Sequence, residues 1–233
     1  LVGVGMGLVG WLLFRDNPED CGLVMDGRDD PDWHARMKRK TAPIRHEFSR
    51  SEAVRTPAFW AVTLAVGIHG LAITAFTFHL RAIGESIGLS AQETYAVLLP
   101  MAFYSVAANL IGGWLSDYVP IKWLVVAMMV AQALGSVGMM GFNFPFERFL
   151  LISGYGVAGG FYAVLITGAF PRFFGRRLLG AISGLSMSIL VILSAVAPAM
   201  YLAGQWLLGH MSAVAFASLS MPVVTIVLAI WAD

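Results

Sequence analysis

Residues 57–80 read PAFWAVTLAVGIHGLAITAFTFHL, a run of 24 residues without Asp, Glu, Lys or Arg. A helix of about 20 apolar residues crosses the hydrocarbon core of a bilayer, so this run is long enough to span a membrane. Further uncharged runs follow at residues 94–116, 123–146, 149–171 and 178–232, and the last of them has the length of two spans. The sequence therefore predicts a polytopic membrane protein.

The composition supports the same conclusion. Hydrophobic residues make up 58% of the 233-residue chain and charged residues 12%, with a mean hydropathy of +0.75. Soluble domains carry about 25% charged residues. Because the runs are too long for barrel strands and do not alternate, they satisfy their backbone groups in lipid only as helices. The predicted fold class is all-α.

The chain divides into three parts. Residues 1–14 are apolar but rise only about 21 Å as a helix, against a core of about 30 Å, and we expect the end of a truncated transmembrane helix. Residues 15–56 form a polar linker, and residues 57–233 form a six-helix transmembrane bundle. The expected spans lie near residues 57–83, 91–115, 123–142, 148–170, 179–204 and 207–231.

The basic residues predict the orientation. Thirteen of the fifteen Lys and Arg residues fall in alternate loops: the linker, the loop with Lys122 and the loop at residues 172–177. By the positive-inside rule these loops and the C-terminus are cytoplasmic, in a plasma or cytoplasmic (inner) membrane. Residues 33–56 hold seven bases against two acids; they suit either an amphipathic helix on anionic lipid or a solvated loop.

A tight polar turn, GGWLSDYVPIK, occupies residues 112–122. Its glycines allow two helices to approach closely, and Asp117 can face the positive N-terminal end of a neighbouring helix. Lys122 can anchor the next span at the headgroups. The pattern from Gly113 to Asp117, followed by a base, resembles the loop signature of the major facilitator superfamily, although Tyr118 stands where that family usually has a base.

Two further segments extend this resemblance. Residues 15–23 (RDNPEDCGL) are similar to the charged stretch after the sixth helix in the oxalate/formate antiporter and monocarboxylate transporter branches of the family. Residues 170–177 (FPRFFGRR) are similar to the turn that these branches carry between their tenth and eleventh helices. The resemblance implies the second half of a twelve-helix transporter, which requires the missing N-terminal six-helix half of the same polypeptide.

The resemblance also implies residues that gate the conformational change: Gly113, Asp117, Lys122, Arg176 and Arg177. The arginines of the second turn, including Arg172, have the simpler interpretation of topology anchors. Beyond this turn, Gly180, Gly184 and Ser188 recur every four residues, which predicts close contact with another helix.

In this fold the first helix of each three-helix repeat lines the central cavity, so the resemblance points to the spans at 57–83 and 148–170. His69 lies about 18 Å along the first of them, near the midplane, where polar side chains are functional candidates. Its imidazole can bind a carboxylate or relay a proton. The alternative is a neutral histidine bonded to a backbone carbonyl of the next helix.

The same span holds two further candidates for substrate binding near its outer end, His79 and Arg81. An arginine at the mouth of a cavity can attract anions. The simpler interpretation is an ion pair with Glu85, one helical turn further along.

In the span at 148–170, Tyr155, Gly159 and Tyr162 fall on one helix face, which places hydroxyl groups beside a gap. Ordinary packing of the tyrosines is the alternative. Secondary candidates for the substrate site are Tyr104, Asn109 and Gln132.

The resemblance implies secondary active transport of a small organic anion such as a monocarboxylate, by alternating access. Relatives that bind small dianions or monocarboxylates commonly hold an arginine in the eighth helix, and those of the oxalate exchanger type add a lysine in the eleventh. Residues 94–116 and 178–204 hold no base. A dicarboxylate substrate is therefore disfavoured, and monocarboxylate transport is a hypothesis. The chain has no nucleotide-binding loop of the Gly-x-x-x-x-Gly-Lys-Ser/Thr type, and we expect no enzymatic activity, cofactor, metal or nucleic-acid partner.

Two other classes fit parts of the sequence. A seven-helix receptor or sensor suits the helix count, but the half-length first span and the long first loop argue against it. An intramembrane serine hydrolase would use Ser183 with His210 as its base. We expect these two residues at opposite ends of adjacent helices, about 30 Å apart, which disfavours a hydrolase.

Overall fold

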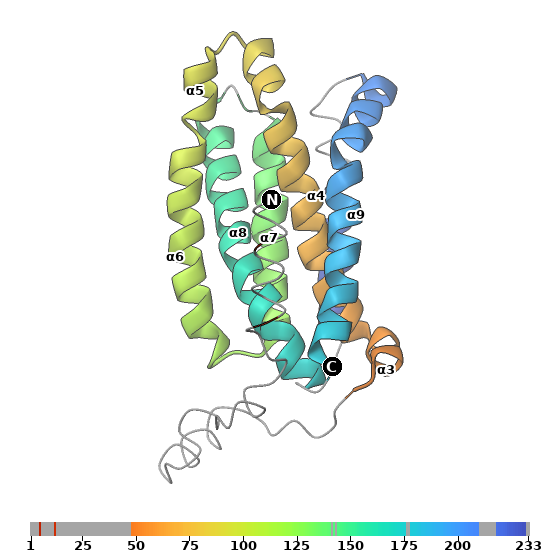
Figure 1. Ribbon diagram of the computed structural model, residues 1–233. Helices are drawn as coiled ribbons and strands as arrows, with labels where there is room; N and C mark the ends of the chain where they lie inside the picture. The colour runs from red at the N-terminus through yellow and green to blue at the C-terminus, as the bar shows by residue number, and fades with distance from the viewer. Residues whose placement is uncertain are drawn as a thin grey trace. The chain divides into compact units, whose positions relative to one another are not determined.

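The computed structural model describes Gly5, Leu12 and residues 48–140, 142, 144–175, 178–209 and 218–231. The chain forms two units, Leu1–Pro43 and Ile44–Asp233, and the helices named below belong to the second. They are α3 (Arg50–Val54), α4 (Pro57–Ser86), α5 (Ala91–Tyr95), α6 (Leu98–Ser116), α7 (Ile121–Met140), α8 (Pro145–Phe174), α9 (Leu179–Leu208) and α11 (Ser220–Trp231) (Figure 1). The predictions for residues 15–47, for Arg176 and Arg177, and for His210 lie outside the described residues.

Five stretches are long and apolar enough to cross a membrane: α4, α5 with α6, α7, α8 and α9. The apolar α11 covers the end of the sixth predicted span with 12 residues, and residues 210–217 lie outside the description. All regular structure in the described residues is helical. The prediction of an all-α polytopic membrane protein is confirmed.

Several helices extend beyond the predicted spans because they continue until a residue breaks the backbone pattern. α4 runs on to Ser86 before Gly88 takes a φ of 78°, and α8 runs on to Phe174 before Gly175 takes a φ of 82°. Both angles lie in the region that glycine adopts without steric cost. The predicted span at 91–115 is divided into α5 and α6 by a turn after Tyr95.

The short helices begin at residues that satisfy free backbone N–H groups. Ser49 starts α3 with a capping box, in which its hydroxyl accepts from the N–H of Glu52 and the Glu52 carboxylate accepts from the N–H of Ser49. Ser90 and Glu93 repeat this arrangement at α5. Such caps fix where a helix starts, so polar loop residues set the ends of the apolar spans.

The helices pack through a few close pairs. α8 packs against both α6 and α7, α4 packs against α9, and α11 contacts α4 and α7. Glycines allow α7 and α8 to approach: a Cβ at Gly138 would collide with the backbone of Leu151, and a Cβ at Gly154 would lie 2.7 Å from the carbonyl oxygen of Ala131. Small residues at such contacts are typical of helix packing in lipid.

The predicted close contact along Gly180 and Gly184 is wrong within this unit. A Cβ at either position would meet no described atom within 4 Å. The physical reason is that α9 packs mainly on α4 and leaves most of its apolar surface exposed in this unit. That surface includes the exposed side chains of Val191, Ile192 and Leu202.

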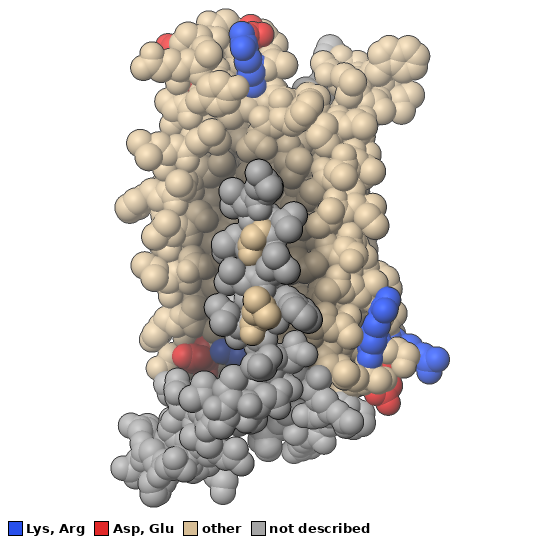
Figure 2. Space-filling view, in the orientation of Figure 1, with Lys and Arg blue, Asp and Glu red and all other residues tan. Residues whose placement is uncertain are grey.

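Two hydrophobic clusters divide the core along α4. The first includes Phe59, Phe170 and Phe174, and the second includes Phe76 and Tyr155. Figure 2 shows the charged side chains of the visible face at the two ends of the bundle, with an uncharged band between them. That band has the character expected of a surface in contact with hydrocarbon.

Candidate functional site

His69 lies on α4 between the residues that supply the two hydrophobic clusters. Its side chain is 4% exposed, and its Nδ1 lies 2.8 Å from Oε1 of Gln132 on α7, which is 1% exposed. With the amide oxygen as acceptor, Nδ1 donates the hydrogen bond and Nε2 of the neutral ring carries a lone pair. The partner of His69 is therefore a side chain of α7 and not the backbone carbonyl considered above.

The other side of the imidazole faces α8 and α6. The ring of Tyr162 lies 5.2 Å from the His69 ring, centroid to centroid. A Cβ added at Gly159 would lie 3.6 Å from Nε2 of His69 and 3.3 Å from Oγ of Ser105 on α6. Because Gly159 has no side chain, Nε2 of His69 and the Ser105 hydroxyl both lie close to this point of α8.

This grouping, which we call the His69 site, consists of His69, Ser105, Gln132, Gly159 and Tyr162. Ser105, Gly159 and Tyr162 are partly exposed, whereas His69 and Gln132 are buried. The sequence pattern predicted His69 on one span, grouped Tyr162 and Gly159 with Tyr155 on another, and gave Gln132 a secondary place. Ser105 was missed, although its central position in an uncharged span was an available signal.

Tyr155 does not join this site. Its ring is buried, its hydroxyl lies 3.4 Å from Oγ of Ser136 and 3.9 Å from Sδ of Met139, and it packs edge-on against Phe76 at 5.6 Å. These contacts join α8 to α7 and α4. Tyr155 therefore acts in packing, the alternative weighed above.

The contacts of Tyr104 and Asn109 that are described below do not involve His69. The Tyr104 ring meets Phe103 and Phe149 edge-on, at 6.3 and 6.4 Å. Nδ2 of Asn109 donates to the backbone oxygen of Gly160 over 3.4 Å. The contacts of Tyr104 with Phe149 and of Asn109 with Gly160 join α6 to α8, and the contact of Tyr104 with Phe103 lies within α6.

His79 and Arg81 lie ten and twelve residues beyond His69 on α4, which corresponds to about 15–18 Å of helix. Nε2 of His79 lies 3.1 Å from the backbone oxygen of Pro198 on α9. Nε of Arg81 pairs with Oε1 of Glu85 at 2.7 Å, and their side chains are 67% and 56% exposed. The simpler interpretation of Arg81, an ion pair with Glu85, is confirmed. Water screens the charges of such an exposed pair, so the pair adds little to stability.

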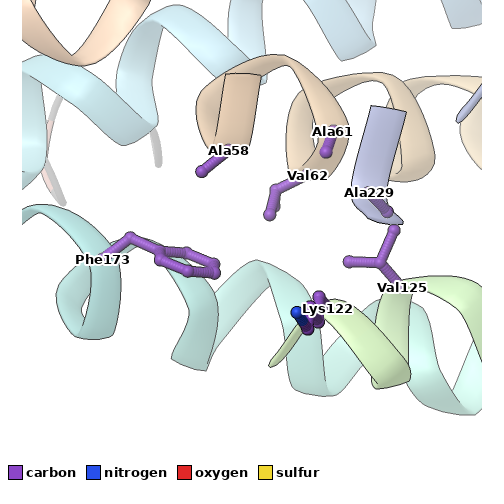
Figure 3. A pocket seen from close by; sticks show the side chains of 7 residues that line it. All are labelled: Ala58, Ala61, Val62, Lys122, Val125, Phe173 and Ala229. Atoms are coloured by element: carbon purple, nitrogen blue, oxygen red, sulfur yellow. The ribbon is translucent and has the colours of Figure 1, made fainter. Parts of the chain in front are cut away.

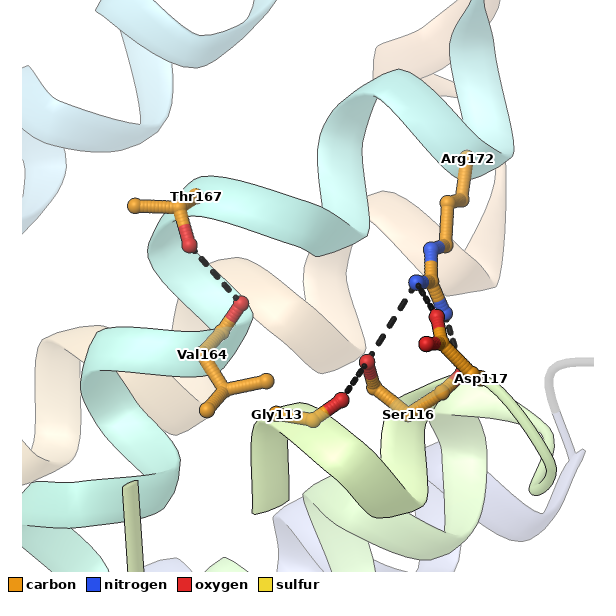
Figure 4. A network of polar contacts seen from close by, with 6 residues as sticks. All are labelled: Gly113, Ser116, Asp117, Val164, Thr167 and Arg172. Carbon is orange, nitrogen blue, oxygen red and sulfur yellow. Dashed lines mark hydrogen bonds and ion pairs between the residues drawn. The ribbon is translucent and has the colours of Figure 1, made fainter. Parts of the chain in front are cut away.

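At the end of the bundle that the charge pattern predicts to be cytoplasmic, Arg172 of α8 reaches the end of α6 (Figure 4). Its guanidinium donates to the backbone oxygen of Ser116, to Ser116 Oγ at 3.3 Å and to Asp117 Oδ1 at 3.1 Å. Ser116 Oγ donates in turn to the carbonyl of Gly113 over 2.7 Å. A cation at the carbonyl end of a helix is stabilising.

This arrangement changes the expectation for Asp117. Its partner is Arg172 near the end of α8, not the N-terminal end of a neighbouring helix. The sequence predicted only a role in topology for Arg172. Its contact with Asp117 could not be predicted, because the two residues are 55 positions apart in the chain. Gly113 meets no described atom within 4 Å of an added Cβ, whereas Gly112 faces the ring of Phe161 at 3.0 Å.

Lys122, the second residue of α7, lies beside an apolar pocket between α4, α7, α8 and α11 (Figure 3). The pocket is lined, besides Lys122, by Ala58, Ala61, Val62, Val125, Phe173 and Ala229. The aliphatic stem of a lysine commonly covers apolar surface in this way while its charge stays at the interface. The contacts around Lys122 fit its predicted position at the headgroups.

A serine hydrolase site and a metal site find little support among the described residues. Oγ of Ser183 donates to the carbonyl of Leu179 over 2.7 Å, a bond within its own helix. Its proposed base, His210, is outside the description. Among the described residues, no three His, Cys, Asp or Glu side chains group as metal ligands do.

Comparison with known protein families identifies this chain. The family model of the Major Facilitator Superfamily matches residues 1–198, which is most of the chain. No curated protein matches the chain. The match agrees with the fold, because five stretches of the described residues are long and apolar enough to cross a membrane. The chain therefore belongs to the Major Facilitator Superfamily, whose members are membrane transporters.

Proposed function

We propose that this chain supplies the second six-helix half of a twelve-helix secondary transporter, and that the transporter moves a small organic anion such as a monocarboxylate by alternating access. The observation that carries the proposal is the His69 site, where Nε2 of a buried histidine and a serine hydroxyl meet at a gap left by Gly159. Midplane sites between two rocking halves are typical of such transporters.

The chemistry of the His69 site favours an anion with one charge. Ser105 and Tyr162 carry hydroxyl groups that can donate to a carboxylate, and a protonated His69 would add a positive charge. Residues 57–80, 94–116, 123–146, 149–171 and 178–209 hold no Asp or Glu to repel an anion and no Lys or Arg to balance a second charge. A monocarboxylate fits this balance better than a dicarboxylate.

The gating residues form a second part of the proposal. Asp117 and Lys122 flank the turn between α6 and α7, and Arg172 ties that turn to α8. We expect Gly113, Arg176 and Arg177 to act at the same end of the bundle, so that this end opens and closes as the halves rock. The charge pattern supports a cytoplasmic position for it.

The receptor and hydrolase alternatives are not favoured by the family match. A complete receptor would need no second half, whereas α6 and α9 leave large apolar surfaces uncovered in this unit. Lipid and a second six-helix half together account for those surfaces.

The test is uptake by the purified full-length protein in liposomes. Radiolabelled formate, acetate, L-lactate and oxalate are supplied outside, with and without the same acid loaded inside. We expect saturable uptake of at least one of the monocarboxylates and little uptake of oxalate. If none of the acids enters faster than into protein-free liposomes, the organic-anion proposal is wrong.

A further inference from the structure

We propose that one water molecule binds in a small polar cavity between α4, α7, α9 and α11, where it bridges Gln132, Ser136 and Tyr201 and so joins α9 to α7. Gln132 lines this cavity and His69 does not, and water binding there does not depend on which substrate is transported. Three features carry the proposal: the size and lining of the cavity, a buried hydroxyl without a partner, and the unused hydrogen-bonding capacity of the groups beside it.

The first feature is the cavity itself. Its free volume is about 10 Å³, close to the roughly 10–15 Å³ that a single buried water requires. One wall is apolar and comes from α4 and α11, and the other holds Gln132 and Ser136 of α7, Tyr201 of α9, and Ser218. An apolar cavity of this size stays dry, whereas one with two to four polar partners holds water.

The second feature is the hydroxyl of Tyr201. The residue is 3% exposed, and its hydroxyl has no hydrogen-bond partner among the described residues. Ser218 lies close to it on the cavity wall, but without the geometry of a hydrogen bond. Buried tyrosine hydroxyls usually find a partner, because a buried polar group without one loses the bonds that solvent would give it. A water in the cavity is such a partner.

The third feature is the unused capacity of the two groups on α7. Oε1 of Gln132 lies 2.8 Å from Nδ1 of His69, which leaves both N–H groups of the amide for other partners. Oγ of Ser136 lies 3.4 Å from the hydroxyl of Tyr155, longer than an ordinary O–H···O bond of about 2.5–3.0 Å. A water that accepts from Gln132 and bonds to the hydroxyls of Ser136 and Tyr201 makes three hydrogen bonds, the usual number for a buried water.

The same groups do not suit a metal cation. Ca²⁺ and Mg²⁺ take oxygen ligands, carboxylates above all. The described residues of the cavity wall include no Asp or Glu, and Gln132 has its amide oxygen engaged with His69, so that its N–H donors remain. A neutral molecule that both donates and accepts matches this set, and water is the one that fits the volume.

The bridge is most important for α9. This helix packs mainly on α4, and it contains Pro198, which has no N–H to bond the carbonyl of Ser194 one turn earlier. Tyr201 follows three residues later, beyond the weakened turn. Nε2 of His79 on α4 lies 3.1 Å from the backbone oxygen of Pro198, and the water adds a second attachment, to α7. We therefore expect loss of the water to loosen the end of α9.

The first test is the direction in which Y201F changes thermal stability. This variant keeps the ring and removes the hydroxyl. If the hydroxyl bonds a water, Y201F breaks the bridge, and we expect the melting temperature of the full-length protein in detergent to fall by about 2–4 °C. If the hydroxyl is buried without any partner, its removal relieves a cost and raises the melting temperature. An unchanged or higher melting temperature would overturn the proposal.

Y104F is the matched control, because Tyr104 does not line the cavity, and it should melt as the wild type does. A double-mutant cycle then shows whether the two hydroxyls share one ligand. S136A and Y201F each release the same water, so the double variant should lose clearly less than the sum of the two single losses. Additive losses would contradict a shared water.

The direct observation is a cryo-EM map of the full-length wild type, at a resolution that shows buried waters elsewhere in the protein. We expect one density peak within about 3.2 Å of Gln132 Nε2, Ser136 Oγ and the Tyr201 hydroxyl, and no peak there in Y201F. A wild-type map without this peak would overturn the proposal, whatever the stability of Y201F. Because the map needs no variant, it decides the question even if Y201F fails to fold.

Discussion

At the scale of the residue, the His69 site depends on the absence of a side chain at Gly159. Five glycines of α8 are placed differently: Gly154, Gly156 and Gly160 meet the backbone of a neighbouring helix, Gly159 meets two polar side-chain atoms, and Gly168 meets no described atom within 4 Å. A methyl group at Gly159 would contact Ser105 Oγ and His69 Nε2 at 3.3 and 3.6 Å. The first distance is tight and the second is ordinary contact, so the helix can hold the methyl group while the site loses its space.

We therefore expect G159A to fold and to lower L-lactate uptake at least tenfold. G168A is the matched control, because it adds the same methyl group to the same helix in open space. It should transport normally and keep or slightly raise its thermal stability, since alanine is favoured over glycine in helices by up to about 1 kcal/mol. Equal uptake by G159A and wild type would place the substrate elsewhere.

At the scale of the element, the contact between α7 and α8 is set by backbone approach. A Cβ at Gly154 would meet the N–H of Gly135 and lie 2.7 Å from the carbonyl oxygen of Ala131. Because backbone atoms cannot move aside as a flexible side chain does, G154A must separate the helices. Overpacking of this kind costs about 1–3 kcal/mol. We expect a markedly lower melting temperature in detergent for G154A than for G168A, measured by fluorescence-detected size exclusion after heating.

The link between α6 and α8 through Arg172 belongs to the same scale. R172Q removes both the ion pair with Asp117 and the donor to the Ser116 carbonyl, whereas D117N removes the pair alone. An exposed pair is worth about 0.2–1 kcal/mol. R172Q should therefore lower the melting temperature more than D117N, and the double variant should match R172Q. Additive losses in the double variant would show that the two side chains do not interact.

At the scale of the whole molecule, the orientation in the membrane is open to direct measurement. Cys21 is the single cysteine of these 233 residues, so C21S, together with replacement of any cysteine in the N-terminal half, gives a background for labelling. Ser51 is exposed on α3, just before α4, and Gln92 is exposed on α5, just after it. In intact cells an impermeant maleimide should label Q92C, and it should label S51C only after permeabilisation. The reverse pattern would invert the predicted topology and move the gating residues to the outer side.

Much of the architecture was predictable because membrane insertion is a local property. Each apolar run had to form a helix to satisfy its own backbone, and the number of residues needed to cross the core is fixed by its thickness. The helix ends were predicted less well. Their positions depend on capping residues such as Ser90 and on glycines such as Gly175, which act after the apolar run has ended.

The fold class, the approximate spans and the polar residues at membrane depth, including His69, follow from the order of the amino acids alone. Only the tertiary structure decided that Gln132 and Ser105 join His69, that Tyr155 does not, and that Asp117 meets Arg172. These contacts join residues 36 to 63 positions apart on different helices, with the exception of Tyr155 and Ser136. Their meeting depends on how closely helices pack and which faces they turn to each other, and periodicity within one helix carries no information about either.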